Sequence, residues 1–201
     1  MAFRLDEFRA SLVTDGARPS LFEVQMVFPL ITTTGGTAPG AFGTASQQVT
    51  FRAKATSLPG DSLSAIPINY FGRQIKVAGT RTFPDWSFTV INDEDFNIRN
   101  NFERWMSGIN SHVSNLRTPS MISGDGGYQT DAYVYQFSKV GGPPIKSYKI
   151  VGCFPTDVSA IDLDWGAGDQ IEEFSVTFAY QWWETLETTD SSSSAGLFQT
   201  L

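Results

Sequence analysis

Apolar and polar side chains alternate with a period of two residues over much of this chain, and this pattern constrains the fold most strongly. The clearest example is the segment FSVTFAYQWW, residues 174–183. Successive side chains of a strand point to opposite faces, so this segment would carry one unbroken apolar stripe: Phe174, Val176, Phe178, Tyr180 and Trp182. The opposite face is small and uncharged: Ser175, Thr177, Ala179 and Gln181. The pattern predicts a long strand with one buried face and one bland face.

Other segments repeat this alternation. Four of them carry apolar residues at alternate positions: Phe22, Val24, Met26 and Phe28; Val49, Phe51, Ala53 and Ala55; Trp86, Phe88 and Val90; Tyr133, Tyr135 and Phe137. Segments 145–152 and 158–165 are predicted to be two more strands. The segment IPINYFGRQIKV, residues 66–77, is predicted to be a bent strand or a long hairpin arm, because Pro67 and Gly72 interrupt its regularity.

One segment has helical periodicity instead. Between Asp93 and His112 the apolar residues recur at helical spacing: Ile98, Phe102, Trp105, Met106 and Ile109. Asn92 is a suitable N-cap, and the acidic residues 93–95 would lie where the helix dipole favours negative charge. We expect a single helix that covers one opening or one face of the sheet structure.

Together these elements predict a mainly β, antiparallel fold, either a sandwich or a small barrel, with one α-helix. The 201 residues suffice for one substantial domain, which we place at residues 1–184. Residues 31–48 are predicted to form a loop rich in Gly, Thr and Ala. Residues 185–201 form a polar tail that is either flexible or docked on a neighbouring subunit.

Charge is unevenly spread along the chain, whose formal net charge is −7. All 14 Lys and Arg lie at or before Lys149, whereas the last 52 residues carry nine acidic residues and no Lys or Arg. This polarity argues against generic nucleic-acid binding, which needs a basic surface. It is typical either of a solvated acidic face with a loose tail or of a subunit whose acidic end stacks on another copy.

Catalytic chemistry finds little support in the sequence. His112 is the single histidine and follows a predicted helix end, where it favours a surface position. Cys153 is the single cysteine, so an intrachain disulfide is impossible, and we expect it to pack in the interior. Nucleophile elbows, phosphate-binding loops and zinc-binding helices are absent from the sequence. We therefore predict no enzymatic activity, no cofactor and no metal.

The segment DLDWGAGDQIEE, residues 162–173, comes nearest to a ligand-binding motif. Asp162, Asp164 and Glu173 match three ligand positions of a calcium-binding EF-hand loop. Gly166 and Ala167 do not match the positions that need an oxygen ligand and a glycine, so a turn at residues 166–169 explains the segment better. Exposed aromatic residues would also fit a ligand-binding or carbohydrate-binding β module, which we keep as an alternative.

Four segments, in order along the chain, carry a resemblance to a known family. They are ARPSLFEV from Ala17, IPINYFGRQIKVAG from Ile66, VAGTRTFPDWSFTVINDEDFNIRNNFERW from Val77, and LDWGAGDQIEEFSVTFAYQWWE from Leu163 to Glu184. The sequence resembles the tail tube proteins of contractile-tailed bacteriophages. Two parts depart from the family: the loop at Ile31–Gln48 is longer, and the tail after Glu184 is an addition.

The resemblance implies a structural subunit of a hexameric ring with a continuous inner β-barrel, and rings that stack head to tail into a hollow tube. Its implied partners are other copies of the chain, the tail sheath protein, baseplate and tail-terminator proteins, and, transiently in the lumen, the tape-measure protein and DNA, with no membrane. The implied location is the virion tail, after assembly in the bacterial host cytoplasm. A tube of a contractile secretion or bacteriocin device is the nearest alternative.

Two sets of site residues follow from combining the resemblance with the strand pattern. A conduit for DNA should not hold DNA, so we expect the bland face of the last strand to line the lumen, with the sheath side as the alternative: Glu173, Ser175, Thr177, Ala179 and Gln181. Segment Leu58–Gly79 is too apolar for a free loop and either reaches a neighbouring subunit or packs in its own core. Its apolar residues are Ile66, Ile68, Tyr70, Phe71, Ile75 and Val77.

Overall fold

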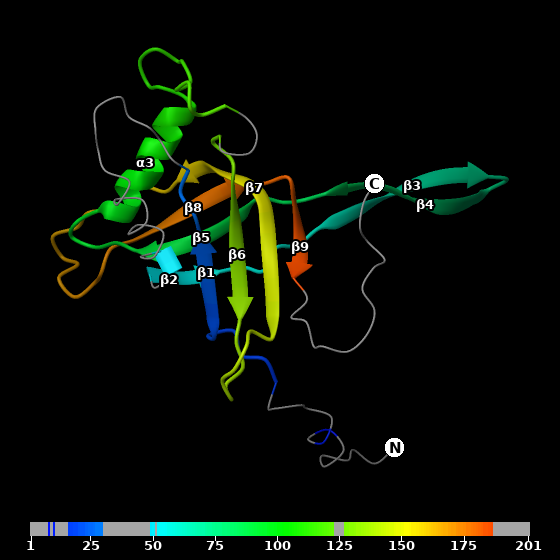
Figure 1. The fold of residues 1–201 in the computed structure, drawn as a ribbon. Helices are drawn as coiled ribbons and strands as arrows, with labels where there is room; N and C mark the ends of the chain where they lie inside the picture. Colours follow the sequence, from blue (N-terminus) through cyan, green and yellow to red (C-terminus); the bar gives the residue numbers. More distant parts are fainter. Residues whose placement is uncertain are drawn as a thin grey trace.

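Nine β-strands and one long α-helix make up the part of the chain that the computed structural model describes, residues 8, 10, 16–29, 49–50, 52–122 and 127–186 (Figure 1). The strands are β1 Phe22–Met26, β2 Ala53–Thr56, β3 Ser62–Tyr70, β4 Arg73–Thr82, β5 Trp86–Ile91, β6 Thr130–Gln136, β7 Lys146–Val158, β8 Glu173–Ala179 and β9 Trp182–Leu186, and the helix is α3 Asn97–Ile109. The predicted loop at 31–48 and the tail beyond Leu186 lie outside the described residues. The prediction of a mainly β, antiparallel fold with one helix is confirmed.

Strand β7 joins two halves of a single antiparallel sheet, whose order is β1-β6-β7-β8-β5-β2 with β9 also paired to β7. The first half of β7 pairs with β6 and β9, and residues Phe154–Val158 pair with β8. Gly152 lies between these halves at φ 65°, a conformation that favours glycine. A side chain there would also approach Gln181 Cγ to 3.1 Å. The glycine therefore allows the bend at which β7 passes from one half to the other.

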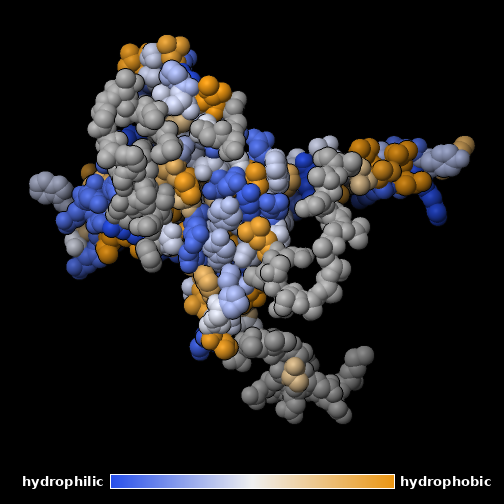
Figure 2. Space-filling model, in the orientation of Figure 1, coloured by the Kyte–Doolittle hydropathy of each residue, from blue (hydrophilic) through white to orange (hydrophobic). Residues whose placement is uncertain are grey.

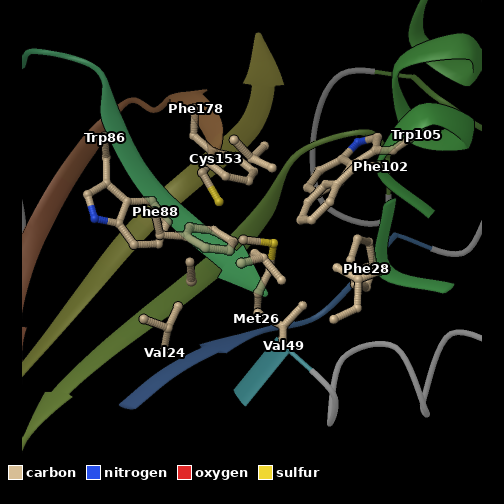
Figure 3. Close-up of a cluster of buried hydrophobic side chains, with 14 of the residues drawn as sticks. Val24, Met26, Phe28, Val49, Trp86, Phe88, Phe102, Trp105, Cys153 and Phe178 are labelled. Atoms are coloured by element: carbon tan, nitrogen blue, oxygen red, sulfur yellow. The ribbon is translucent and has the colours of Figure 1, made fainter. Parts of the chain in front are cut away.

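The core lies between the two halves of the sheet and α3 (Figure 3). Phe178 is at its centre, with its ring stacked on Phe88 at 5.4 Å between centroids and within 6.3 Å of the rings of Trp86, Phe102 and Trp105. Alternate residues of β1, β5 and β8 are buried as their sequence predicts: Val24, Met26, Trp86, Phe88, Val90, Phe174, Val176 and Phe178. The apolar residues of the alternating pattern in these strands are therefore the residues that form the core.

Helix α3 packs against this core through Ile98, Phe102 and Trp105, as its periodicity predicts. Its predicted start was wrong, because the helix begins at Asn97 and Asn92 does not cap it. Instead Asn92 donates its side-chain amide to Glu172 Oε2 at 2.9 Å and its backbone N–H to the Glu172 carbonyl at 2.8 Å. These bonds tie the end of β5 to the segment before β8. In the described part of the chain, no helix is long and apolar enough to cross a membrane.

Two predicted strands differ from the observed ones. The strand predicted at 49–55 begins only at Ala53, and Val49, Thr50 and Arg52 have helical backbone. Segment 158–165 is not a strand, because β7 ends at Val158 and residues 159–172 form a loop. A short alternating run supplies one strand face but no partner, and a strand needs both.

Two predictions about buried faces are also corrected. In β6 the buried residues are Ala132 and Val134, while the rings of Tyr133 and Tyr135 stack 6.2 Å apart on the opposite face. The predicted strand 174–183 is divided into β8 and β9, and Trp182 is 49% exposed. The division occurs at Gln181, whose backbone N–H bonds the Val151 carbonyl. There the chain leaves its partner β5, and β9 continues along the same edge of β7 with which β8 pairs.

Candidate interaction surfaces

The outward face of the β5–β8 ladder is a continuous surface of small hydroxyl side chains. Ser87 lies opposite Thr177, and Thr89 lies opposite Ser175. Asp157 of β7 is opposite Thr177 on the other side, and Glu173 is opposite Ile91 at the end of the ladder. We call these six residues the hydroxyl face: Ser87, Thr89, Asp157, Glu173, Ser175 and Thr177. Its charges are acidic apart from Lys54, whose Nζ lies 2.5 Å from Glu173 Oε1.

Four of the five residues predicted to line a lumen lie along β8: Glu173, Ser175, Thr177 and Ala179. Gln181 is separate from them, because it follows the end of β8 and its side chain occupies the space that a Cβ at Gly152 would need. Sequence reasoning missed Asp157, since the alternating pattern placed it near a strand that does not form. Ser87 and Thr89 alternate with the apolar residues of their strand, and the pairing of β5 with β8 joins them to this face.

Strands β3 and β4 form a hairpin that extends away from the rest of the molecule, and we call residues Ser62–Thr82 the arm (Figure 1). Within the described residues the two strands pair only with each other. Phe71 and Gly72 form a two-residue turn with φ values of 42° and 79°, as in the tight turns that join twisted antiparallel strands. The predicted hairpin arm is therefore present, and Gly72 is part of its turn.

The arm has one apolar and one polar face. Ile66 lies opposite Val77 and Ile68 lies opposite Ile75, with Tyr70 following on the same face. The opposite face carries Pro67 and Asn69 against Lys76 and Gln74. All the apolar residues predicted for the arm are exposed in this single chain, and Phe71 at the tip is 91% exposed. Figure 2 shows hydrophobic side chains gathered along the arm.

Three aromatic side chains hold the root of the arm, residues Ser57–Gly60. Trp86 Nε1 donates to the Ser57 carbonyl at 2.9 Å, and Trp183 Nε1 donates to the Gly60 carbonyl at 3.2 Å. The hydroxyl of Tyr180 donates to the same Gly60 carbonyl at 3.4 Å. Burial, with the nearby carboxylates Asp61 and Asp85, raises the pKa of Tyr180, so the hydroxyl stays protonated as a donor. Tyr180 and Trp183 therefore position the arm and also pack against the core.

Replacing Trp183 by Phe is expected to loosen the arm, because it removes the indole N–H donor to Gly60 and keeps an aromatic ring in place. A lost hydrogen bond of this kind costs about 1 kcal/mol. Hydrogen exchange should therefore speed up in residues 58–82 and stay unchanged in β5 and β8. Trp182→Phe is the matched control, since Trp182 is half exposed and, among the described residues, its indole makes no hydrogen bond to the root. Equal exchange rates in the arm of both variants would contradict this role for Trp183.

At the other end of the β5–β8 ladder lies an acidic surface, which we call the acidic pole and define as residues 93–95 and 161–173. It holds eight acidic residues and no Lys or Arg: Asp93, Glu94, Asp95, Asp162, Asp164, Asp169, Glu172 and Glu173. Its 161–173 loop also exposes Leu163, Trp165 and Ile171, of which Trp165 is completely exposed. Asp162–Trp165 and Ile171–Glu173 help to line a hollow of about 710 Å³.

The residues that the sequence analysis considered for catalysis or metal binding do not form a catalytic or metal site among the described residues. His112 is exposed beyond the end of α3. Cys153 is buried and unpaired, and burial raises the pKa of its thiol. Among the described residues no group of acidic, His or Cys side chains is arranged to hold a metal ion. Asp164 and Glu173 instead bond the Gly166 backbone N–H and Lys54.

The family model and the relatives that match this chain by sequence are all tail tube proteins. The family model described as phage tail tube protein matches residues 17–186. The chain is 33% identical over 182 residues to tail tube protein gp19 of Enterobacteria phage T4, a match that covers 89% of this chain and 98% of the relative. It is 24% identical over 178 residues to a tail tube protein of Serratia phage KSP90, covering 88% of this chain and 93% of that one.

Solved structures share the fold at lower sequence identity. A chain in the anti-feeding prophage baseplate aligns with a TM-score of 0.60 at 14% identity, over 87% of this chain and 97% of that chain. A chain in the sheath–tube complex of an extracellular contractile injection system aligns with a TM-score of 0.54 at 11% identity, over 92% and 99%.

Proposed function

Because this chain belongs to the phage tail tube protein family, we propose that its copies close into hexameric rings that stack head to tail into a hollow tube. The chain is a structural component of the virion tail and has no enzymatic role. Six sheets side by side would complete the inner wall of the tube, which a single open sheet cannot do. The identity of 33% to a phage protein favours a contractile phage tail over a secretion device.

The observation that carries this proposal is the unpartnered arm. A two-stranded hairpin is marginally stable alone in water, and an exposed apolar face of this length is typical of an interaction site. Ile66, Ile68 and Val77 are each about half exposed in the single chain. A neighbouring copy would cover them and use the exposed hairpin for assembly instead of leaving it as an aggregation hazard. Negative-stain microscopy of the purified chain tests the proposal, with rings or tubes of uniform width as the expected result.

We place the hydroxyl face toward the lumen of the tube. Ser87, Thr89, Ser175 and Thr177 offer few charges to phosphates and little surface for base stacking. Asp157 and Glu173 add negative charge, which repels DNA. This combination supports passage of DNA without retention. The sheath protein would then contact the outside of the tube, and baseplate and terminator proteins its two ends, with the tape-measure protein inside before DNA. We place assembly of the tube in the host cytoplasm.

Replacing Thr177 by Lys is expected to slow DNA release without preventing tube assembly. One Lys on each of six subunits would add a ring of positive charge at every layer of the tube, and each neutralised phosphate adds salt-dependent affinity. We expect infectivity to fall at least about tenfold, and a single-particle ejection assay to show slower release that recovers at higher salt. Asn100→Lys, on the exposed side of α3, is the control with the same added charge. If Thr177→Lys tails assemble and eject DNA at the normal rate, the hydroxyl face does not line the lumen.

A further inference from the structure

The arm and the acidic pole lie at opposite ends of the same pair of strands. Trp86, the first residue of β5, follows the arm after three residues, and it pairs with Phe178 near the end of β8. Ile91, the last residue of β5, pairs with Glu173, which belongs to the acidic pole. The ladder between them contains six residue pairs, a length of about 17 Å. Figure 1 shows the arm and the loop between β7 and β8 on opposite sides of the molecule.

Charge on the two ends is complementary. The arm contains Arg73, Lys76 and Arg81 and no acidic residue. Arg81 pairs with Asp61 at 3.2 Å, and among the described residues no carboxylate lies within ion-pair distance of Arg73 or Lys76. In the acidic pole, Arg52 pairs with Asp93 and Asp95, and Lys54 pairs with Glu173. Eight acidic residues and these two basic partners leave a formal charge of −6.

Apolar surface accompanies the charge at both ends. The arm presents Ile66, Ile68 and Ile75 beside its basic residues, and all three are exposed. The acidic pole presents Leu163, Trp165 and Ile171 beside its carboxylates, around the hollow of about 710 Å³. Nine residues of β3 at roughly 3.3 Å each extend the arm by about 30 Å, which is long enough to reach well into a neighbouring molecule.

We propose that the arm of one copy docks on the acidic pole of the next copy. Arg73, which lies on the apolar face opposite Tyr70, then faces Asp162 and Asp169, and the Ile-rich face covers Leu163 and Trp165. The contact joins two different surfaces of the same chain, so it is heterologous and propagates from copy to copy. Opposite charges set the partner and direction of this contact, and the apolar residues stabilise it. The inference rests on the proposed tube function and names the surface that the arm binds.

Charge reversal separates this docking from other modes of assembly. We expect Arg73→Glu to raise the lowest concentration at which tubes form at least about tenfold, because like charges would then face each other. Asp162→Lys with Asp169→Lys should have the same effect from the other side. Both aspartates are exposed, and we avoid Asp164 because its Oδ1 accepts the Gly166 N–H at 2.9 Å. Arg104→Glu reverses the same amount of charge as the arm variant at an exposed site outside both surfaces and should assemble normally.

Mixing provides the decisive measurement. In an equimolar mixture, each reversed arm meets a reversed pole, and each unchanged arm meets an unchanged pole, provided that the two variants alternate. Tubes should therefore return in the mixture and contain both variants in equal amounts, and the chain that carries all three substitutions should assemble alone. Normal tubes from the arm variant, or no recovery in the mixture of two folded variants, would overturn the docking and leave the tube function intact. A wild-type chain that remains monomeric would overturn both.

Discussion

A chain that carries Ile68→Asp is expected to fold into a soluble monomer that forms neither rings nor tubes. Ile68 lies at the middle of the apolar face of the arm and is half exposed. Among the described residues it belongs neither to the buried core nor to the side chains packed against it. Folding of the monomer should therefore be unaffected. In the assembled tube, however, the new carboxylate would be buried against a neighbour without a partner, which costs several kcal/mol. Sedimentation velocity should show monomer at about 100 times the concentration at which the wild type assembles.

Asn69→Asp is the matched control for this prediction, because it adds the same charge one residue further along the same strand. Asn69 lies on the polar face of the arm, opposite Gln74, and both variants place Asp equally unfavourably in a strand. A second test is Phe71→Asp at the tip, since Asp tolerates the positive φ of that turn position. Tubes of normal width from Ile68→Asp would show that the apolar face of the arm does not contact a neighbour.

Phe178→Ala is expected to destabilise the monomer by about 3–5 kcal/mol, the usual cost of deleting a fully buried aromatic ring. Phe178 is completely buried, and its ring contacts those of Trp86, Phe88, Phe102 and Trp105. These rings come from β5 and α3, so the cavity would separate the helix from the sheet. Since domains of this kind have total stabilities of about 5–15 kcal/mol, the variant should unfold at a much lower urea concentration.

The measurement needs a background that does not assemble, because polymerisation would add to the apparent stability. Urea unfolding followed by tryptophan fluorescence in the Ile68→Asp chain provides it. Thr177→Ala is the matched control: it removes a side chain of the adjacent residue on the hydroxyl face, where about 0.5 kcal/mol is the typical cost. Similar unfolding midpoints for Phe178→Ala and Thr177→Ala would contradict the central position of Phe178 in the core.

The two candidate contact surfaces, the arm and the acidic pole, could be predicted from the sequence only in part. The exposed apolar residues of the arm were predictable, because a segment with Ile66, Ile68, Ile75 and Val77 is too apolar for a loop that stays in water. Its freedom from the core was not predictable, since the same residues would suit a buried strand. The two acidic segments, 93–95 and 162–173, were visible in the sequence only separately, and nothing in the sequence joined them into one surface. Its position opposite the arm depends on the pairing of Ile91 with Glu173, two residues that lie far apart in the sequence.

By itself, the sequence determined which residues form most of the core and which face of β1, β5 and β8 they occupy. Alternation has this power because the two faces of a strand follow from local backbone geometry alone. Tertiary structure alone decided where β8 ends, why Trp182 is exposed while Trp183 is packed, and which face of β6 turns inward. These outcomes depend on hydrogen bonds to distant partners, such as Gln181 to Val151. A local pattern contains no information about which partner is available, so it cannot specify register, the bend in β7 or the free arm.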